Sequence, residues 1–379
     1  MYPGPTSKIR VIVAPNSMKG SLSAIRFADL IGQAFHAVSD RFEVIKIPVA
    51  DGGDDTAGVL MQTLQLKEIS VPVHDPLGRI IQAKYGYANK TALIEMAGAS
   101  GLKLLSRNEL NPLETSSRGT GELLLDALKR GAKHILMGVG GSATIDGGMG
   151  LLEGLGLSFT DKNGQKLRAS GANLGLIDSW NDEALQAFRN VDLKVMCDVN
   201  NPLLGHRGAV AIFGAQKGAT PEMMPVLEKN LMYFAGLIRE RYGFELDNIP
   251  GMGAAGGVNL ALCVFLNARL LSGADFVLDA LDFDEALKNS RLVVTGEGRI
   301  DSQTAGNKAP FAVAKRARQR HVPILAIGGE ITPEGASLFD FSYSLVNDRV
   351  DQLTAIEQAD RLVYERAKQA AQDFLDRPD

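Results

Sequence analysis

The sequence is poor in the residues that build disulfide frameworks, metal clusters and catalytic thiols. Its 379 residues include two cysteines, five histidines and one tryptophan. Cys197 and Cys263 stand in apolar surroundings, which favours inert core positions over nucleophiles. The histidines show no metal-ligand spacing, and no Gly-x-Ser-x-Gly elbow occurs. These absences exclude a disulfide scaffold and argue against thiol, zinc and serine-hydrolase chemistry.

The chain also has no excess of positive charge and no long apolar run. Its net charge is −4, so no broad basic field exists to hold nucleic acid. The first eight residues contain no secretory apolar core, and the most apolar stretch, residues 260–271, is too short to span a bilayer. Apolar residues at 45% and charged residues at 22% are typical of a globular protein. We therefore expect a soluble, cytoplasmic monomer or homodimer that binds neither membrane nor nucleic acid.

Strand-like segments alternate with helical ones at both ends of the chain, which indicates parallel βαβ units. In these parts the sequence predicts strands at 10–14, 43–49, 292–295, 323–327 and 341–345, and helices at 21–38, 56–64 and 351–375. The middle begins differently, with a predicted antiparallel meander. There we expect strands at 68–73, 80–87, 91–96, 134–137 and 195–199, and helices at 121–130, 221–242 and 254–271.

The predicted fold class is α/β, with two domains and mostly parallel, Rossmann- or flavodoxin-like sheets. The chain is long enough for two cores. Residues 1–66 plus 288–379 should form a discontinuous Rossmann-like domain, and residues 67–287 an inserted α/β domain. Enzymes built this way usually hold their ligand between domains, so we expect the active site in the cleft between them.

The segment Thr295-Gly-Glu-Gly-Arg-Ile-Asp301 places two carboxylates and a guanidinium after an apolar strand. A loop at the carboxyl end of a parallel strand lies where open α/β sheets bind ligands. Glu297 and Asp301 need a partner if they are buried, and Arg299, Lys308 or a metal ion would supply one. A surface ion-pair loop explains this segment alone equally well.

Two further loops combine glycine with isolated charges. In Ala14–Ser23, helix capping explains Ser21 or Ser23, but not Lys19, which the positive end of a helix dipole disfavours unless an anion is present. After the second strand, three aspartates surround a double glycine. Asp54 and Asp55 fit the first turn of a helix, whereas Asp51 is a candidate for Mg²⁺ or for accepting a hydroxyl proton.

The loop at residues 137–150 is rich in glycine, which leaves backbone amides open to a ligand. No P-loop pattern occurs in the chain. Gly138-x-Gly140-x-x-Ala143, with Asp161 further on, matches a dinucleotide fingerprint, although the next segment is short for a crossover helix. A nicotinamide-dependent reductase of a small hydroxy or keto acid is therefore the alternative function.

Another loop places Asp198 at a strand end and Lys217 before a helix. Lysines, carboxylates and glycine loops, without histidine or cysteine chemistry, favour phosphoryl transfer. That reaction needs positioning, Mg²⁺, charge neutralisation and a carboxylate that accepts the hydroxyl proton.

Residues 14–24, Ala-Pro-Asn-Ser-Met-Lys-Gly-Ser-Leu-Ser-Ala, resemble the opening of the bacterial glycerate kinase family, type I. Other blocks of that family are resembled, in order, by residues 48–53, 115–122, 138–146, 197–218 and 295–301. The resemblance implies two α/β domains and ATP- and Mg²⁺-dependent phosphorylation of D-glycerate, commonly to 2-phosphoglycerate, with 3-phosphoglycerate as the alternative product. Asn16 and Asn200 depart from it, since the family commonly has aspartate there.

The roles of individual residues are hypotheses. Asp198 is the first candidate for the base and Asp51 the second; Lys19 and Arg299 would neutralise carboxylate or phosphate charge. Glu297 and Asp301 are candidates for Mg²⁺. Substrate or nucleotide binding is assigned to Ser17, Gly52, Gly53, Gly140, Gly141, Ser142, Thr144, Lys217, Gly296, Gly298 and Lys308. A sensor that binds a small acid without turning over ATP is a third possibility.

Overall fold

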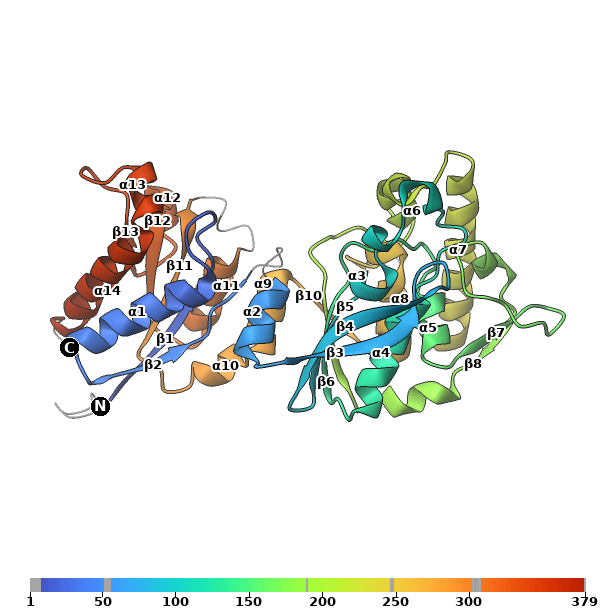
Figure 1. Ribbon diagram of the computed structural model, residues 1–379, viewed down its shortest axis with the longest axis horizontal. Helices are drawn as coiled ribbons and strands as arrows, with labels where there is room; N and C mark the ends of the chain where they lie inside the picture. The colour runs from blue at the N-terminus through green and yellow to red at the C-terminus, as the bar shows by residue number, and fades with distance from the viewer. Residues whose placement is uncertain are drawn as a thin grey trace. The chain divides into compact units, whose positions relative to one another are not determined.

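The computed structural model describes residues 8–50, 56–188, 190–245, 249–301, 304 and 308–377. The chain divides into two compact units (Figure 1). Unit 1 comprises Met1–Leu64 and Ser272–Asp379, and unit 2 comprises Gln65–Leu271. The α/β fold class with mostly parallel sheets is confirmed.

Unit 1 is built on a five-stranded parallel sheet in the order β13-β12-β11-β1-β2. Its strands are β1 (Ile9–Pro15), β2 (Phe42–Lys46), β11 (Leu292–Ile300), β12 (Ile324–Ile331) and β13 (Phe341–Ser344). The central strands are continuous buried apolar runs, as in Val11–Val13 and Leu292–Val294, because helices cover both faces. Packing between β1 and β11 aligns Val13 with Val294.

Helices α1 and α14 pack together on one face of this sheet (Figure 1), and α11 contacts β1, β11 and β12. The helices of unit 1 are α1 (Ala24–Val38), α2 (Thr56–Thr63), α9 (Gly273–Ala280), α10 (Phe283–Ala286), α11 (Ala309–Gln319), α12 (Pro333–Ala336), α13 (Gln352–Glu357) and α14 (Ala359–Leu375). Helix α1 begins after Ser23, whose hydroxyl accepts a hydrogen bond from the Arg26 amide.

Helices α9 and α10 belong to unit 1, whose second segment starts at Ser272. Arg316 of α11 holds them in place. Its guanidinium pairs with Asp275 at 3.0 Å, Asp279 at 2.7 Å and Asp284 at 2.9 Å. These ion pairs join residues that are 32 to 41 positions apart, which the alternation of strands and helices along the chain does not reveal.

Unit 2 contains a six-stranded mixed sheet in the order β10-β9-β6-β5-β4-β3. Strands β3, β4 and β5 are antiparallel neighbours, which confirms the predicted meander, and β5, β6, β9 and β10 are parallel. Its strands are β3 (Lys67–His74), β4 (Ile80–Ala88), β5 (Thr91–Glu95), β6 (His134–Gly138), β9 (Asp192–Met196) and β10 (Arg269–Leu271), and a separate pair is β7 (Ser158–Thr160) with β8 (Ser179–Asn181).

Helices of unit 2 surround a single core that runs from Val73 to Leu266. The α-helices are α3 (Ala97–Ser100), α4 (Arg118–Lys129), α5 (Met149–Gly154), α6 (Ala209–Phe213), α7 (Met223–Tyr242) and α8 (Val258–Leu266). Short 3₁₀ helices are η1 (Leu102–Leu104), η2 (Arg107–Glu109), η3 (Asn173–Leu176), η4 (Glu183–Phe188), η5 (Ala215–Lys217) and η6 (Ala254–Gly256). Among the described residues, no helix combines the length and apolar character needed to cross a bilayer.

Three predicted elements are wrong in extent. The strand predicted to end at residue 295 continues to Ile300, because β12 runs beside it as far as Ile331. The helix predicted at 254–271 is η6, α8 and the edge strand β10, since Asn267 takes a left-handed conformation and ends α8. The last predicted helix is two helices, α13 and α14, which meet at Gln358.

Candidate active site

The carboxyl end of the unit 1 sheet has a point where the order of the strands reverses. From β1 the chain moves to β2 on one side, whereas from β11 it moves through β12 to β13 on the other. Ligands bind at such a point in open α/β sheets, because the two connections diverge and leave a crevice. The structure brings Ser17 and Lys19, which follow β1, to the same edge as Glu297 and Arg299 of β11.

The loop after β1 is fixed at its start and forms a tight turn at its tip. Asn16 is buried, its amide donates to the Gly296 carbonyl at 2.8 Å, and its side-chain oxygen accepts from the Ser17 amide at 2.8 Å. Met18 and Leu22 pair as a bridge, which places Lys19 in the exposed turn between them. Lys19 therefore lies before α1 and is not part of its capping structure.

Glu297 is buried within β11 and is held by partners that come from the next segment of the chain. The Thr304 hydroxyl donates to its carboxylate at 3.0 Å, and the Lys308 ammonium lies 3.6 Å from the same oxygen. Gly296 is required beside it, since an added Cβ would lie 2.0 Å from the Ile327 carbonyl oxygen. The segment predicted as a glycine loop is therefore a strand that presents a buried carboxylate.

Arg299 is exposed on the same strand and pairs with acidic groups on its own side of the sheet. Its guanidinium lies 3.2 Å from the Asp301 carboxylate and 3.8 Å from that of Glu330. The ion-pair interpretation of this segment is therefore correct for Arg299 and Asp301, while Glu297 is placed in the interior. Exposed ion pairs of this kind contribute little stability, so Arg299 is available to an anion at small cost.

A pocket of about 210 Å³ opens at this edge of unit 1. Residues from the β1 loop, from the ends of β11 and β12, and from α13 line it: Met18, Lys19, Ser21, Gly298, Arg299, Gly329, Glu330, Val346, Gln352, Ala355 and Ile356. Three of the sequence-predicted site residues, Lys19, Gly298 and Arg299, thus share one cavity. The contribution of α13 was not predicted, because residues 346–356 contain no glycine and nothing in their sequence shows that they lie beside the β1 loop.

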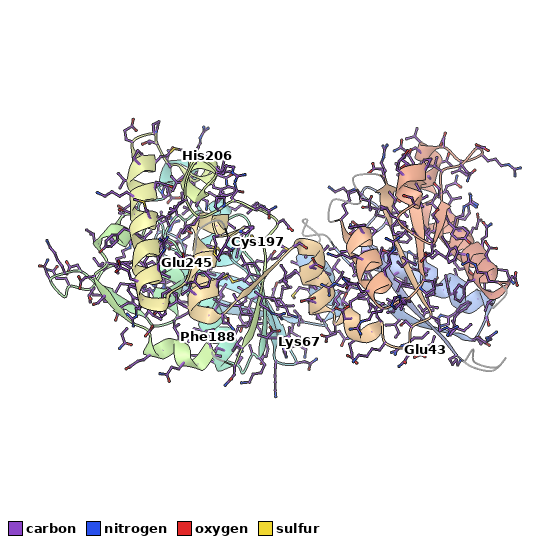
Figure 2. The ribbon with its side chains drawn as sticks, turned by 180° about the vertical axis from the view of Figure 1, so that it is seen from behind. Glu43, Lys67, Phe188, Cys197, His206 and Glu245 are labelled. Atoms are coloured by element: carbon purple, nitrogen blue, oxygen red, sulfur yellow. The ribbon has the colours of Figure 1, made fainter. Side chains whose placement is uncertain are left out.

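Unit 2 brings its candidate residues to the carboxyl edge of its parallel strands. Strands β6 and β9 are neighbours and end opposite each other, with Gly138 beside Met196. The glycine-rich loop follows β6, and Asp198 follows β9 after Cys197, which Figure 2 labels. Asp198, Gly140 and Gly141 are exposed at this edge.

The glycine-rich loop is fixed by backbone pairing with residues 100–102. The Leu102 amide donates to Gly141 and the Ala143 amide donates to Ser100, each at 2.9 Å. Gly141 takes a positive φ of 70°, which favours glycine at the turn of the loop. The loop therefore has a defined conformation that leaves Gly140 and Gly141 open to solvent.

Lys217 is buried beneath this loop and acts as its support. Its ammonium donates to the Ser142 hydroxyl and to the Thr144 carbonyl, both at 2.8 Å. Burial lowers the pKa of Lys217 to about 7, against the attraction of Asp146. The side chain of Thr144 is fully buried as well, so within unit 2 neither residue presents its polar group to solvent.

Asp146 is the buried carboxylate that accompanies Lys217, and it joins the loop to α4 and α5. It accepts hydrogen bonds from the amide and hydroxyl of Ser117 at 2.7 and 2.8 Å, and from the amides of Gly148 and Gly150. Burial raises the pKa of Asp146, although these four donors act in the opposite direction. Sequence analysis did not assign Asp146; its place after the glycine run was the signal that could have identified it.

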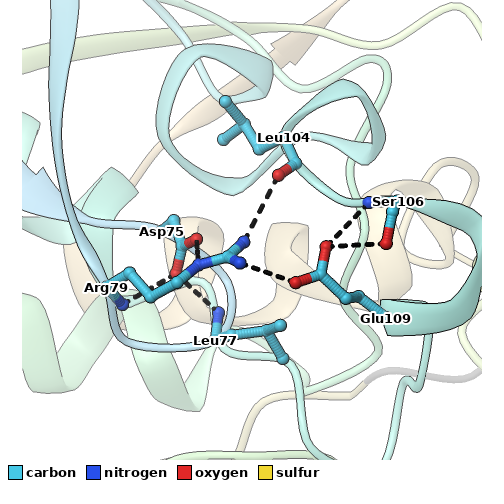
Figure 3. A network of polar contacts seen from close by, with 6 residues as sticks. All are labelled: Asp75, Leu77, Arg79, Leu104, Ser106 and Glu109. Atoms are coloured by element: carbon cyan, nitrogen blue, oxygen red, sulfur yellow. Dashed lines mark hydrogen bonds and ion pairs between the residues drawn. The ribbon is translucent and has the colours of Figure 1, made fainter.

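A network of charged groups holds the segment that pairs with the loop (Figure 3). Arg79 donates to the buried carboxylate of Asp75 at 2.5 Å and to Glu109 at 2.6 Å. Glu109 also accepts hydrogen bonds from the amide and the hydroxyl of Ser106. These two bonds, together with the one from Arg79, hold the pKa of Glu109 below its ordinary value. These contacts tie the turn between β3 and β4 to η1 and η2, the short helices in the same segment as the residues that pair with the glycine-rich loop.

The structure contradicts the dinucleotide interpretation of this loop. A Rossmann fingerprint opens directly into a crossover helix, whose N-terminus receives the pyrophosphate. Here α5 begins at Met149, well after Ala143, and has six residues. Asp161, the candidate ribose ligand, instead accepts the amides of Asn163 and Gln165 in a tight turn.

The cysteines are unreactive in this structure, as the sequence predicts. Burial raises the pKa of the Cys197 thiol, and it raises the pKa of Cys263 to about 12. The thiolate is the nucleophilic form, so neither residue is suited to covalent catalysis. Within the described part of the chain, no group of three or more histidine, cysteine, aspartate or glutamate residues has the arrangement of a metal centre.

Asp51, Gly52 and Gly53 lie outside the described residues. The remaining predicted residues fall into two sets. Unit 1 carries Ser17, Lys19, Gly296, Glu297, Gly298, Arg299, Asp301 and Lys308, and unit 2 carries Gly140, Gly141, Ser142, Thr144, Asp198 and Lys217.

The fold is that of a two-unit α/β protein whose polar and glycine-rich segments gather at the carboxyl ends of parallel strands. Over residues 11–375 the sequence matches the glycerate kinase family. It is 40% identical over 369 residues to the glycerate kinase of Bacillus cereus, covering 97% of each chain. It is 38% identical over 369 residues to the glycerate 2-kinase of Escherichia coli, again covering 97% of each chain.

A crystal structure from Salmonella typhimurium LT2, provisionally named glycerate kinase 2, superposes with a TM-score of 0.81 at 38% identity. That alignment covers 97% of this chain and 99% of the other. The chain belongs to the glycerate kinase family and is an enzyme of the kinase class.

Proposed function

We propose that this enzyme transfers the γ-phosphoryl group of ATP to D-glycerate and releases 2-phosphoglycerate. Membership of the glycerate kinase family carries the proposal, and the name of the Escherichia coli relative, glycerate 2-kinase, supports attack by the hydroxyl at carbon 2. Lys19 and Arg299, which line the pocket of unit 1, have the charge that the phosphates and the glycerate carboxylate require. The cytoplasmic location and the division into domains 1–66 with 288–379 and 67–287 stay predictions.

The reaction needs a group that accepts the proton of the attacking hydroxyl, and we assign this role to Asp198. Its exposed carboxylate follows β9, next to the strand that leads into the glycine-rich loop. Asp51 is the second candidate. Lys19 and Arg299 would neutralise charge that develops on the transferred group, which is the main requirement of phosphoryl transfer.

The residues at the end of β11 fit a magnesium ion. Mg²⁺ prefers oxygen donors and is commonly bound by one or two carboxylates together with substrate phosphates. Glu297 and Asp301 would supply the carboxylates, and Lys308, 3.6 Å from Glu297, offsets the charge of Glu297. When bound, the ion would neutralise phosphate charge.

The glycine-rich loop of unit 2 is proposed to bind an anionic part of the substrates through its backbone. Gly140 and Gly141 are exposed, and successive backbone amides in such turns attract anions. Ser142 and Thr144 receive the ammonium of Lys217, so we propose that these three residues keep the loop in its binding conformation.

Steady-state release of ADP from ATP, in the presence of Mg²⁺ and D-glycerate, tests this proposal. Asp198→Asn should lower kcat on the order of 10²–10⁴-fold, because the variant cannot accept the proton. Asp161→Asn is the matched control, since Asp161 is a partly exposed aspartate in a turn of the same unit. Turnover of NADH with hydroxypyruvate, without ADP release from ATP, would instead establish the reductase.

If Asp198→Asn retains near-native kcat while the wild type releases ADP, the kinase assignment stands and Asp198 is not the base. The same assay on Lys19→Ala should show a higher KM or a lower kcat. Unchanged kinetics for both substrates would remove Lys19 from the site.

A further inference from the structure

The lining of the unit 1 pocket combines two chemical kinds of side chain. Those of Met18, Val346, Ala355 and Ile356 are apolar. Those of Lys19, Ser21, Arg299, Glu330 and Gln352 are polar or charged, and Gly298 and Gly329 contribute backbone alone. A ligand that fills this cavity must therefore offer an apolar surface as well as hydrogen-bonding groups and negative charge.

Of the two proposed substrates, the nucleotide has this combination and glycerate does not. Glycerate is a three-carbon acid with two hydroxyls, so it has no apolar face to place against four apolar side chains. A purine base has two apolar faces and a polar edge, its ribose has hydroxyls, and its phosphates are anionic. Small-molecule sites are typically lined by apolar side chains with a few polar groups that fix orientation.

We infer that this pocket is the nucleotide subsite, with a purine base against α13 and the phosphates toward Lys19 and Arg299. The inference rests on the proposed function, and it assigns one of its two substrates to unit 1. Gln352 and Glu330 line the same pocket and offer hydrogen-bonding groups for the base edge or the ribose hydroxyls.

Hydrogen bonds hold α13 and the segment before it against the other parts of the pocket. The Ser21 hydroxyl donates to the Ile356 carbonyl at 3.2 Å, which links the β1 loop to α13. The Val346 amide donates to the Gly329 carbonyl at 2.9 Å, which links the segment before α13 to β12. An added Cβ on Gly329 would lie 2.4 Å from the Gly298 carbonyl oxygen, so close packing of β11 and β12 requires glycine there.

Helix α13 offers a matched pair of variants that tests this inference. Ile356 lines the pocket and is 42% exposed, whereas Leu353, on the same helix, is 72% exposed and does not line it. Binding of ADP is measured by equilibrium dialysis of the full-length protein, so the readout needs no turnover. Ile356→Ala should weaken ADP binding and raise the KM for ATP about tenfold, the lower end of the effect of removing apolar contact in a ligand pocket. The KM for D-glycerate should not change, and Leu353→Ala should behave as the wild type.

Inorganic tripolyphosphate separates the base from the phosphates, because it carries the charge and lacks the base. Protection by tripolyphosphate against thermal unfolding should be equal in the wild type and in Ile356→Ala. A rise in the KM for D-glycerate with unchanged ADP binding would assign the pocket to the acid and overturn the inference. Unchanged binding of both ligands in Ile356→Ala would also overturn it. A third outcome separates the two proposals. If Ile356→Ala weakens ADP binding but the wild type does not phosphorylate glycerate, the nucleotide subsite stands and the proposed function is wrong.

Discussion

Replacement of Lys217 by methionine should change how the stability of unit 2 depends on pH. Lys217→Met keeps the length of the side chain and removes its ammonium, which donates to Ser142 and Thr144 and lies near Asp146. Burial lowers the pKa of Lys217 from its ordinary value of 10.5 to about 7 in the folded protein. Between these two pH values the unfolded chain binds more protons at this site than the folded chain.

The free energy of unfolding of the wild type should therefore rise with pH in this window, relative to that of Lys217→Met. The slope is at most about 1.4 kcal/mol per pH unit, so across the window the difference reaches on the order of 5 kcal/mol. Below pH 7 both states of the wild type are protonated at Lys217, and the difference between the two proteins should no longer change with pH. The sign follows from burial, which disfavours the cation.

The assay is denaturant unfolding of both proteins at a series of pH values from about 6 to about 10, which spans the window between the two pKa values. Trp180 is the single tryptophan of the chain and lies in unit 2, so its fluorescence reports on the unit that contains Lys217. Titrating groups that do not interact with Lys217 are common to both proteins and cancel in the difference. A difference that stays flat from pH 7 to 10 would show that Lys217 keeps its ordinary pKa and would refute the buried support of the loop.

Two substitutions test the packing of unit 1. Gly296→Ala should lower the free energy of unfolding by about 1–3 kcal/mol, because its Cβ would meet the Ile327 carbonyl oxygen at 2.0 Å. Gly58→Ala is the control, since an added Cβ there meets nothing within 4 Å on helix α2 and should stabilise by about 0.5–1 kcal/mol. Equal effects of the two changes in denaturant unfolding would contradict the β11–β12 packing. Arg316→Met should lower the free energy of unfolding by about 2 kcal/mol. The loss is smaller than for a fully buried pair, because two of the three aspartate partners are half exposed. An unchanged denaturation midpoint would show that Arg316 does not anchor α9 and α10.

Local sequence patterns predicted the elements whose stability depends on their own residues. The antiparallel meander and the parallel strands were recognised because alternating or continuous apolar runs determine which side chains are buried. The cap of α1 was recognisable in the same way, since Ser23 satisfies an amide three residues away.

Features that depend on distant partners were not predictable from local pattern. Residues 296–300 contain glycine and charge, which indicate a loop, yet β12 pairs with them and extends β11 to Ile300. Lys217 precedes a helix in an apparently exposed loop, but its partners Ser142 and Thr144 lie more than seventy residues earlier. The contribution of α13 to the pocket likewise could not be predicted from residues 346–356, because it depends on contact with the distant β1 loop.

The most direct test of the proposed reaction is ³¹P NMR of the purified enzyme incubated with ATP, Mg²⁺ and D-glycerate. We expect loss of the γ-phosphate signal of ATP and the appearance of 2-phosphoglycerate. A signal of 3-phosphoglycerate would retain the kinase and contradict the proposed position of phosphorylation. Persistence of ATP with D-glycerate and with other small hydroxy acids would contradict the proposed reaction itself.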